Sequence, residues 1–566
     1  MYRSQIAPLG DAHLPQRNTA HAHRTGPLGA PLKDKSLAPM RPLDFNQLTP
    51  IQKMQRYAQN ETSTVVFLFV WLLSQFLIFG FAFVNYKYNG EFSTVRKALG
   101  MSFLMARGTS LPIEINTAVI LLPMCRSIIS LLRSTPLSHV IPFDKNKTFH
   151  KLTAWTILFF SLVHTIAHFV NFYKLQFLPD GRSWFFYTFA TGPGLTGVLM
   201  LVALLAISAT SITSVRRKNF ELFWYTHHLF ALYFMMYSIH GGFCLIKRDH
   251  PPYCAGASFW KYWTLSGILY LYERVMREWR GSQNTSITRV VLHPSRVVEV
   301  QFKKDGFKMR AGQYIFLCCP DVSLHQWHPF TLTSAPEDDY GSVHIRMAGD
   351  FTKSFASRLG CDLGAKAPQA SSDEGLDRAL PSIMIDGPFG SASEDVFNYE
   401  VSVLVGAGIG VTPFASILRS IWYRLYTPSK QTRLCKVYFF WICRDKEAFE
   451  WFQSLLSVIE QEDTSHIIEI NTFLTGKLQG DEILNLTLNY EAGKEDALTG
   501  LRSPTQFGRP NFGQIFHTLT QQHRATDVGV FFCGPKPLSK SLHLYCNQFS
   551  QVGSDGTKFH YNKENF

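Results

Sequence analysis

The chain has 566 residues, of which 46% are hydrophobic and 17% charged, and its formal net charge is +13 at pH 7. The length allows several domains, and a mean hydropathy near zero conceals an apolar first half and a polar second half. The basic excess lies beside the apolar segments and comes with no nucleic-acid recognition motif. We therefore expect a membrane protein with a large soluble part and no nucleic-acid partner.

Residues 1–60 are rich in Pro, His, Gly and basic residues, and they lack the apolar core of a signal peptide. A segment of this composition cannot bury enough apolar surface to fold alone. It is predicted to be a disordered cytosolic arm, which makes residues 64–84 the first membrane span.

Six apolar blocks of spanning length follow the arm. Lys and Arg gather in the second and fourth loops and after the last block, which predicts that these loops and both termini face the cytosol. Lys87, Arg96 and Lys97, in the first outer loop, run against this bias. The six blocks are residues 64–84, 99–122, 152–170, 195–212, 220–239 and 259–276.

Histidines in the third and fifth blocks are costly in a bilayer unless they face a protein interior, a water path or a metal. His150 and His164 are 14 residues apart, which is about 21 Å along a helix and about 40° from one face. His227 and His240 are 13 residues apart and match that depth. Cross-pairing would put His150 with His227 near the cytosol and His164 with His240 near the outside. Each pair could clamp one haem iron and leave it no open coordination site.

The fifth block does not fit a straight helix. On an ideal helix, His240 points about 140° away from His227 and about 120° away from His228. Periodicity therefore does not decide which of His227 and His228 is the ligand. The span must be bent, bulged or oblique. Any one histidine is more often a packing residue, but four at matched depths on two helices favour ligation. His168, His228 and His139 are extras, expected to pack or to line a cavity.

The ten cysteines form neither a zinc pattern nor a secreted disulfide framework, and most lie in the cytosolic half as expected free thiols. Cys244 and Cys254 both fall in the last outer loop, where we predict a disulfide; two unpaired thiols are the alternative. No C-x-x-C-H motif is present, so any haem is held without thioether links.

From Gly281 onward, short strand-like runs alternate with turns and helical patterns. The segment QWHPFTLTSAP suits a flavin ring against a barrel edge, and HIRMAGDFTKSF adds a guanidinium and a helix start for a pyrophosphate. The candidate flavin residues are His328, Pro329, Phe330, Thr331, Arg346, Gly349 and Thr352.

The segment VSVLVGAGIGVTPFASIL reads as strand, glycine-rich turn and helix, an arrangement that lets backbone approach a dinucleotide phosphate. Arg444, just after another buried strand, could meet an adenosine 2′-phosphate and favour NADPH, with an ordinary surface arginine as the alternative. A further strand ends at a turn that could approach nicotinamide. The candidate nucleotide residues are Gly406, Gly408, Gly410, Thr412, Pro413, Arg444, Cys533, Gly534 and Pro535.

These motifs, with DGPFG, CRDKEAFEWF, GRPNF and the terminal NKENF, closely resemble the catalytic subunit of the superoxide-generating NADPH oxidases of the phagocyte type. In the membrane half, LLPMCR, TFHK, HTIAH and FWYTHHLF fit the same family. The resemblance covers about residues 64–566, whereas the Pro-rich arm is more like that of some fungal members.

The resemblance implies a six-helix, ferric-reductase-like transmembrane haem domain at residues 61–280. The haem domain would be followed by a ferredoxin-reductase-like β-barrel FAD domain at residues 281–395 and an α/β NADPH domain at residues 396–566, with the arm at residues 1–60 before it. It also implies two b-type haems on four ligands, which selects His227 over His228, and it adds Arg509 of GRPNF to the nucleotide site. The implied haem ligands are His150, His164, His227 and His240.

The implied activity passes electrons from cytosolic NADPH through FAD and two haems to oxygen outside, producing superoxide. A ferric-chelate reductase of the same architecture and an inactive membrane scaffold are the alternatives. Molecular oxygen and membrane lipid are expected partners. The family further implies a small stabilising membrane protein, cytosolic activators and a small GTPase, in the plasma membrane or an endomembrane.

Three further residues receive specific predictions. Arg107 in the second block and His168, one turn beyond His164, would form the oxygen site beside the outer haem, unless Arg107 snorkels to the outer surface. Tyr233, midway in depth between the two irons, would bridge the haems, with ordinary packing as the alternative. The terminal Phe566 would cover the flavin ring, although a chain end is normally frayed.

Overall fold

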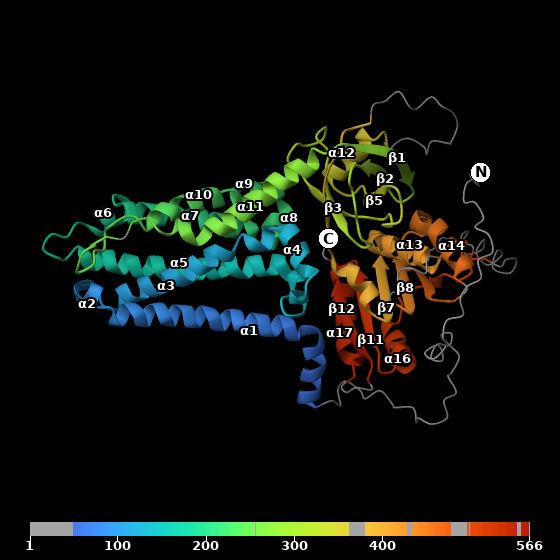
Figure 1. Ribbon diagram of the computed structural model, residues 1–566, viewed down its shortest axis with the longest axis horizontal. Helices are drawn as coiled ribbons and strands as arrows, with labels where there is room; N and C mark the ends of the chain where they lie inside the picture. Colours follow the sequence, from blue (N-terminus) through green and yellow to red (C-terminus); the bar gives the residue numbers. More distant parts are fainter. Residues whose placement is uncertain are drawn as a thin grey trace.

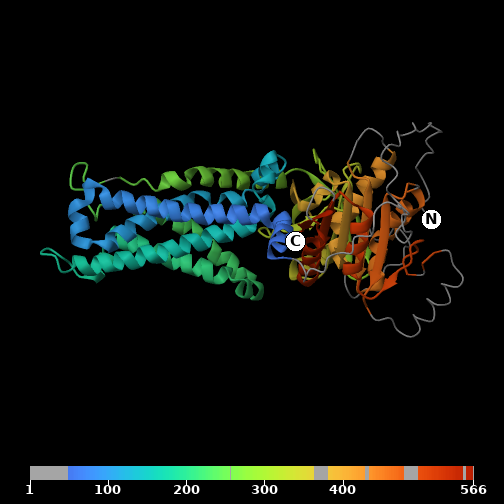
Figure 2. The same ribbon diagram turned by 90° about the horizontal axis from the view of Figure 1, so that it is seen from below.

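The computed structural model describes residues 49–254, 256–361, 380–426, 433–463, 465–476, 495–496, 498–551 and 556–564. Phe566 therefore lies outside the described residues. Figure 1 shows an elongated bundle of helices joined at one end to a part built around β-sheets, and Figure 2 shows the same two parts end to end.

Helix α1 (Pro50–Tyr88) opens the described chain. Its N-cap Thr49 accepts a hydrogen bond from the Gln52 backbone N–H while the Gln52 side chain accepts one from Thr49, and Pro50 occupies the first helical position. The arm predicted to be disordered to residue 60 is thus helical from Pro50. In Figure 1 the first turns of α1 run across the end of the bundle before the helix turns along it.

Helices occupy each of the six apolar blocks. Three described helical stretches are long and apolar enough to cross a membrane by length and composition. A fourth span is possible if the helices Met101–Met124 and Arg126–Arg133, which meet at a bend of 81°, count as one. The number of six spans stays a prediction, because the other two blocks form a broken helix and a more polar one. The bundle helices are α2 (Ser93–Leu99), α3 (Met101–Val119), α4 (Arg126–Arg133), α5 (Asn146–Leu175), α6 (Trp184–Phe189), α7 (Gly192–Ser211), α8 (Thr213–Lys218), α9 (Phe220–His227), α10 (Phe230–His240) and α11 (Trp260–Gly281).

The bundle core is aromatic where α10 packs against α7 and α11. Tyr233, Phe234 and Tyr237 are buried there, together with Ile157 of α5. The loop between α10 and α11 lies at the end of the bundle away from the sheets (Figure 1), and it holds a disulfide between Cys244 and Cys254. The predicted disulfide is confirmed.

Two three-stranded antiparallel sheets, ordered β1-β2-β5 and β4-β3-β6, follow α11. Their facing side chains, including Val300, Ile315 and Val343, form one core with Phe355 of the covering helix. The strands are β1 (Thr285–His293), β2 (Val297–Lys304), β3 (Tyr314–Cys318), β4 (His328–Thr331), β5 (Gly341–Arg346) and β6 (Met384–Phe389), and the helix is α12 (Asp350–Arg358).

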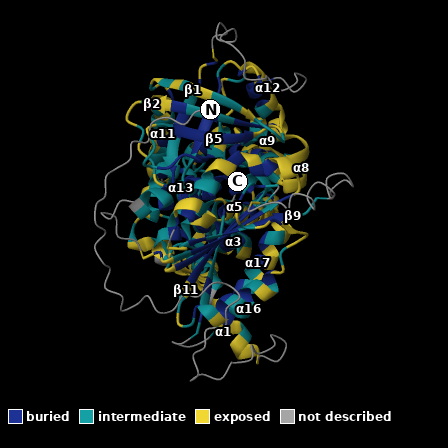
Figure 3. Ribbon diagram, turned by 90° about the vertical axis from the view of Figure 1, so that its right-hand side faces the viewer, coloured by how far each residue is buried: buried dark blue, intermediate teal, exposed yellow. Residues whose placement is uncertain are grey.

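A six-stranded parallel sheet, ordered β10-β9-β8-β7-β11-β12, completes the fold. Alternate residues of its strands enter opposite cores, with Leu404 against α13 and α14 and Val405 against α16 and α17. Figure 3 shows the buried strands between helices whose outward faces are exposed. The elements are β7 (Val401–Ala407), α13 (Thr412–Tyr426), β8 (Lys436–Cys443), α14 (Gln453–Glu462), β9 (Ile468–Leu474), β10 (Gln506–Phe507), α16 (Phe512–Gln522), β11 (Asp527–Cys533), α17 (Lys536–Phe549) and β12 (Lys558–Lys563).

The chain order of this sheet reverses between β7 and β11. Strands β8, β9 and β10 are added on one side of β7, whereas β11 and β12 lie on the other. Ligands of open parallel sheets bind outside the carboxyl ends of the strands at such a switch point. The fold therefore places a binding site beside the ends of β7 and β11.

Candidate functional site

Helices α5, α9 and α10 bring the four predicted ligand histidines together in two pairs. The ring centres of His150 and His227 are 6.3 Å apart, and those of His164 and His240 are 6.5 Å apart. An iron midway would lie about 3.2 Å from each ring centre, as a metal–nitrogen bond of about 2 Å plus the radius of an imidazole ring requires.

A break in the fifth block explains why its periodicity is ambiguous. The helix stops after His227 and resumes at Phe230, with two turn residues between α9 and α10. His228 faces away, because its ring packs on Trp224 at 4.3 Å and its Nδ1 lies 2.7 Å from the Trp224 carbonyl oxygen. The break lets His227 and His240 both face α5.

Three of the four Nδ1 atoms in these pairs are already held. His150 Nδ1 donates to the Ile120 carbonyl and His164 Nδ1 to the Ala106 carbonyl, each at 2.9 Å, and His240 Nδ1 lies 2.8 Å from the Thr196 hydroxyl. Such bonds orient a ring and leave its Nε2 lone pair for a metal. His227 Nδ1 is buried without a hydrogen-bond partner in the described chain. The donor set fits two haems with paired imidazoles.

A cavity of about 400 Å³ adjoins the pair His164 and His240. The predicted oxygen-site residues Arg107 and His168 line it, and the rings of His168 and His164 are 4.6 Å apart. The Arg107 guanidinium carbon lies 5.6 to 5.9 Å from the ring centres of three aromatic residues, and its buried Nε has no hydrogen-bond partner among the described residues. A cation next to this cavity suits an anion inside it, such as a haem propionate.

Tyr233 is buried on α10 between the two histidine pairs and lines the same cavity. Its ring stacks on that of Tyr237 at 6.0 Å with an interplanar angle of 10°. Tyr237 in turn stacks on Phe259 at 5.4 Å. Stacked aromatic rings therefore run from Tyr233 to Phe259, whose ring lies 6.4 Å from that of His240.

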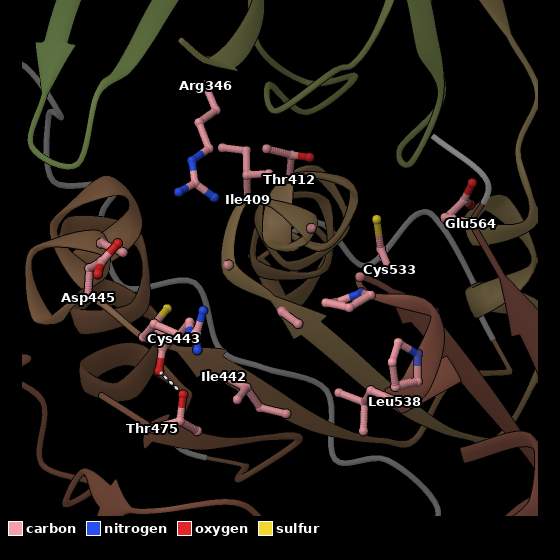
Figure 4. Close-up of a pocket in the computed structure, with 18 of the residues that line it drawn as sticks. Arg346, Ile409, Thr412, Ile442, Cys443, Asp445, Thr475, Cys533, Leu538 and Glu564 are labelled. Atoms are coloured by element: carbon pink, nitrogen blue, oxygen red, sulfur yellow. Dashed lines mark hydrogen bonds between the residues drawn. The ribbon is translucent and has the colours of Figure 1, made fainter. Parts of the chain in front are cut away.

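A second cavity, of about 1070 Å³, lies between the antiparallel sheets and the carboxyl edge of the parallel sheet. Figure 4 shows Arg346 reaching towards Ile409, in the turn after β7, and Thr412, at the start of α13, with Cys533 and Glu564 on the other side. The predicted residues in its lining are Pro329, Phe330, Thr331, Arg346, Gly408, Gly410, Thr412, Arg444, Arg509, Cys533, Gly534 and Pro535.

Five predicted cofactor residues are not part of this lining. The His328 ring packs on Phe351 at 3.9 Å. Gly349 is the N-cap of α12, and the Thr352 hydroxyl accepts the Gly349 N–H at 3.0 Å, so both build the helix start. Gly406 lies in β7 and Pro413 in the first turn of α13, so they shape the turn between them.

The glycine-rich turn after β7 packs closely against the end of β11. A Cβ at Gly410 would lie 2.3 Å from the Cys533 carbonyl oxygen, so only glycine fits there. Gly408 has a φ of +56°, and a Cβ built on it meets no atom within 4 Å. The turn is thus closed toward β11 and open toward the cavity, as a dinucleotide phosphate needs. The cavity fits FAD and a nicotinamide nucleotide.

Three family models match consecutive parts of the chain. They are "Ferric reductase like transmembrane component" at residues 116–238, "FAD-binding domain" at 282–393 and "Ferric reductase NAD binding domain" at 399–547. These matches follow the order of the bundle, the antiparallel sheets and the parallel sheet.

Curated relatives match nearly the whole chain. A superoxide-generating NADPH oxidase heavy chain of Dictyostelium discoideum is 40% identical, over 91% of this chain and 99% of that protein. NADPH oxidase 1 of Mus musculus is 38% identical, over 91% of this chain and 95% of that protein. The chain belongs to the NADPH oxidase family. NADPH oxidase 3 of Homo sapiens is 36% identical, over 90% and 99% of the two chains.

In this NADPH oxidase family member, Glu564 is a site residue that the sequence did not reveal. Its carboxylate is buried in the cavity wall and accepts hydrogen bonds from the Ser391 hydroxyl and the Ser393 N–H, both at 2.7 Å. Burial raises the pKa of Glu564, although these hydrogen bonds oppose the rise. The terminal NKENF motif was a signal for this region, but it pointed to Phe566, which follows two residues later.

Cys533 ends β11 at the cavity wall. Burial raises the pKa of its thiol, and the nearby Glu564 carboxylate adds to the rise. The thiol is therefore neutral at physiological pH and poorly suited to nucleophilic chemistry. Its place at the switch point suits contact with a nicotinamide ring instead.

Proposed function

We propose that this chain is a transmembrane NADPH oxidase that moves electrons from cytosolic NADPH to oxygen on the far side of the membrane, producing superoxide. One observation carries the proposal: two histidine pairs at different depths of the bundle, with the nucleotide cavity beyond the bundle's cytosolic end. The name of the Dictyostelium relative supports the same product.

The residue assignments follow from these places. His150 and His227 would hold the inner haem, and His164 and His240 the outer haem. The residues proposed for FAD are His328, Pro329, Phe330, Thr331, Arg346, Gly349 and Thr352. The residues proposed for NADPH are Gly406, Gly408, Gly410, Thr412, Pro413, Arg444, Arg509, Cys533, Gly534 and Pro535.

When bound, FAD would supply the conversion of a two-electron hydride into single electrons, and the haems would carry single electrons. The chain's own part is to position these groups and exclude water. Two histidines would hold each haem iron, so the residues that would meet oxygen are those of the outer cavity, where Arg107 and His168 lie.

Two aromatic residues complete the proposed path. Tyr233 would fill the gap between the haems as part of the stacked column on α10. Phe566 would cover the flavin ring; Glu564, two residues earlier, lies in the cavity wall and supports this role.

We further propose six membrane spans with both termini in the cytosol. The start of α1 supports this, because the Asn60 amide bonds Asn547 of α17 at 2.8 Å and Tyr561 donates its N–H to Asn60. The N-terminal end of the bundle thus contacts the NADPH-side sheet. A small stabilising membrane protein, cytosolic activators, a small GTPase, and residence in the plasma membrane or an endomembrane belong to the same proposal.

The deciding experiment uses purified full-length protein. Its reduced-minus-oxidised spectrum should show haem with two imidazole ligands, and NADPH should drive reduction of an external dye that superoxide dismutase suppresses. Iron-chelate reduction that is insensitive to dismutase and to removal of oxygen would support a ferric-chelate reductase instead. Absence of haem absorbance would support the third alternative, an inactive membrane scaffold.

A further inference from the structure

Three potential metal ligands meet at one end of the antiparallel sheet, away from both haem pairs. They are His293 at the end of β1, Glu299 in β2 and His344 in β5. One ligand atom from each lies within 4.8 Å of the other two. His344 also lines the nucleotide cavity, but none of the three is among the haem, FAD or NADPH residues assigned above.

Strand register creates this cluster. Glu299 pairs directly with His344 on β5 and with Val291 on β1, so His293 lies two residues further along on the same face. Ser295 and Arg296 both adopt left-handed conformations, with φ near 60°, and form the tight turn from β1 to β2. The turn folds His293 back over Glu299, and the two imidazoles stack at 5.3 Å with an interplanar angle of 21°.

The side chains are oriented as metal ligands. His344 is 7% exposed, and its Nδ1 is held by the Thr333 hydroxyl at 3.0 Å while its buried Nε2 has no hydrogen-bond partner within the described chain. His293 Nε2 is buried and likewise unpartnered among these residues, and it lies 3.6 Å from a Glu299 oxygen. That separation is too long for a hydrogen bond.

The separation is close to that of two ligands on one zinc ion. Tetrahedral zinc with bonds of about 2.1 Å holds its ligand atoms about 3.4 Å apart. The other Glu299 oxygen accepts from the Gln301 amide at 2.9 Å, which orients the carboxylate as hydrogen bonds to a metal ligand do. The three ligand atoms lie within 4.8 Å of one another, so His344 has to move by about 1.4 Å at most for all three to reach one ion.

We propose that His293, Glu299 and His344 form a binding site for a divalent transition-metal ion of the zinc type. Two neutral imidazoles and one carboxylate suit such an ion, and three protein ligands leave its fourth position for water. The site adjoins the NADPH side of the molecule, since the His344 ring lies 4.6 Å from that of Phe452 and Trp451 donates its indole N–H to the Pro294 carbonyl. A bound ion would brace the sheet where the two cytosolic units meet.

The test uses full-length protein in detergent, loaded with haem and FAD, treated with a chelator and then titrated with zinc chloride alone. After desalting, zinc and iron are counted by mass spectrometry, and haem iron gives the number of chains. His293→Gln and Glu299→Gln should each bind one zinc fewer per chain than the wild type, or bind it at least about tenfold more weakly. His293→Cys, which restores a zinc ligand, should recover the ion.

His325→Ala is the matched control, because it removes an exposed imidazole of the same unit. It should bind as much zinc as the wild type. Wild-type protein that retains no zinc, or Gln variants that retain as much as the wild type, would overturn the proposal. FAD content per haem, measured on the same samples, shows that each variant is folded, and the wild-type result decides by itself if a variant is not.

Discussion

Arg133 of the bundle donates a 2.6 Å hydrogen bond to Asp395, across the boundary between the bundle and the nucleotide-binding part. Its Nε also donates to Asp144 at 3.0 Å, within the loop that leads to α5. The Arg133 side chain is only 10% exposed, whereas Asp395 is 37% exposed. One arginine thus ties the end of α4 to the segment that precedes β7.

Replacing Arg133 with Met should weaken this boundary by about 1–3 kcal/mol, because two carboxylates lose their charged partner while the aliphatic volume is kept. NADPH-driven haem reduction should fall several-fold, since the cavity and the inner histidine pair are no longer held in register. Dithionite should still reduce both haems fully. Stopped-flow absorbance of the haem bands measures both reactions.

The control for this change is Lys303→Met, which removes a cation from the ion pair with Asp339. Both of those side chains are mostly exposed, so that pair is worth less than about 1 kcal/mol. An equal loss of NADPH-driven reduction in both variants would assign the effect to lost surface charge and not to the boundary contact.

Local patterns were enough to predict much of the fold. Apolar length located the bundle helices, and the strand–turn–helix pattern around Gly408 located the nucleotide turn at the end of β7. Depth along the helices predicted that His150 pairs with a histidine at the start of the fifth block, whereas the family resemblance selected His227 over His228. The break after His227 could not be predicted, because it depends on how α9 and α10 pack against neighbouring helices.

Contacts between distant segments were not visible in the sequence. Arg133 and Asp395 are far apart in the chain and meet only when the two parts dock. Glu299 meets His344 only through strand register, and a shift by one residue would send one of them to the other face. Residues of this kind carry ordinary local patterns, so only the structure reveals them.

Replacing Arg107 with Ala should lower superoxide production by about tenfold or more, because the outer cavity loses the cation that would stabilise a developing anion. Both haems should stay reducible by NADPH. Dismutase-sensitive cytochrome reduction and haem spectra measure the two effects. Arg182→Ala, which removes another guanidinium packed near a phenylalanine ring, is the control and should be silent. Normal superoxide output from Arg107→Ala would contradict a role in oxygen reduction and indicate that this arginine only packs against its aromatic neighbours.

Tyr233→Ala should slow reduction of the outer haem relative to the inner haem, because the ring that stacks on Tyr237 is removed from the proposed path. Tyr233→Phe keeps the ring and should behave as the wild type. Rapid-mixing spectra that resolve the two haem bands give both rates. The truncation also leaves a cavity that costs about 3–5 kcal/mol, so equilibrium haem content is measured alongside. An unchanged rate in a fully haem-loaded Ala variant would exclude a bridging role.

Arg444→Ala should reduce kcat/KM for NADPH by about 10–100-fold and leave that for NADH nearly unchanged, because a guanidinium to phosphate contact is lost. Steady-state kinetics with both nucleotides on the haem-loaded protein check this. Arg502, exposed and outside the cavity lining, gives the matched control Arg502→Ala. An equal loss with both nucleotides would contradict a role in 2′-phosphate recognition.

Glu564→Gln should change how stability depends on pH. Burial raises the pKa of Glu564 in the folded state, so its protonated form is favoured there. The stability that Glu564 contributes is therefore present below the ordinary glutamate pKa of about 4.3 and is lost as pH rises through the raised value.

Glutamine keeps the carbonyl oxygen that accepts hydrogen bonds from Ser391 and Ser393, and it does not acquire a charge. The thermal midpoint of FAD release from Glu564→Gln should thus match that of the wild type at about pH 4 and exceed it at neutral pH. Glu450→Gln, at an exposed position of the same unit, should follow the wild type throughout. A constant difference between Glu564→Gln and the wild type at every pH would mean that this carboxyl does not titrate in the folded protein over that range.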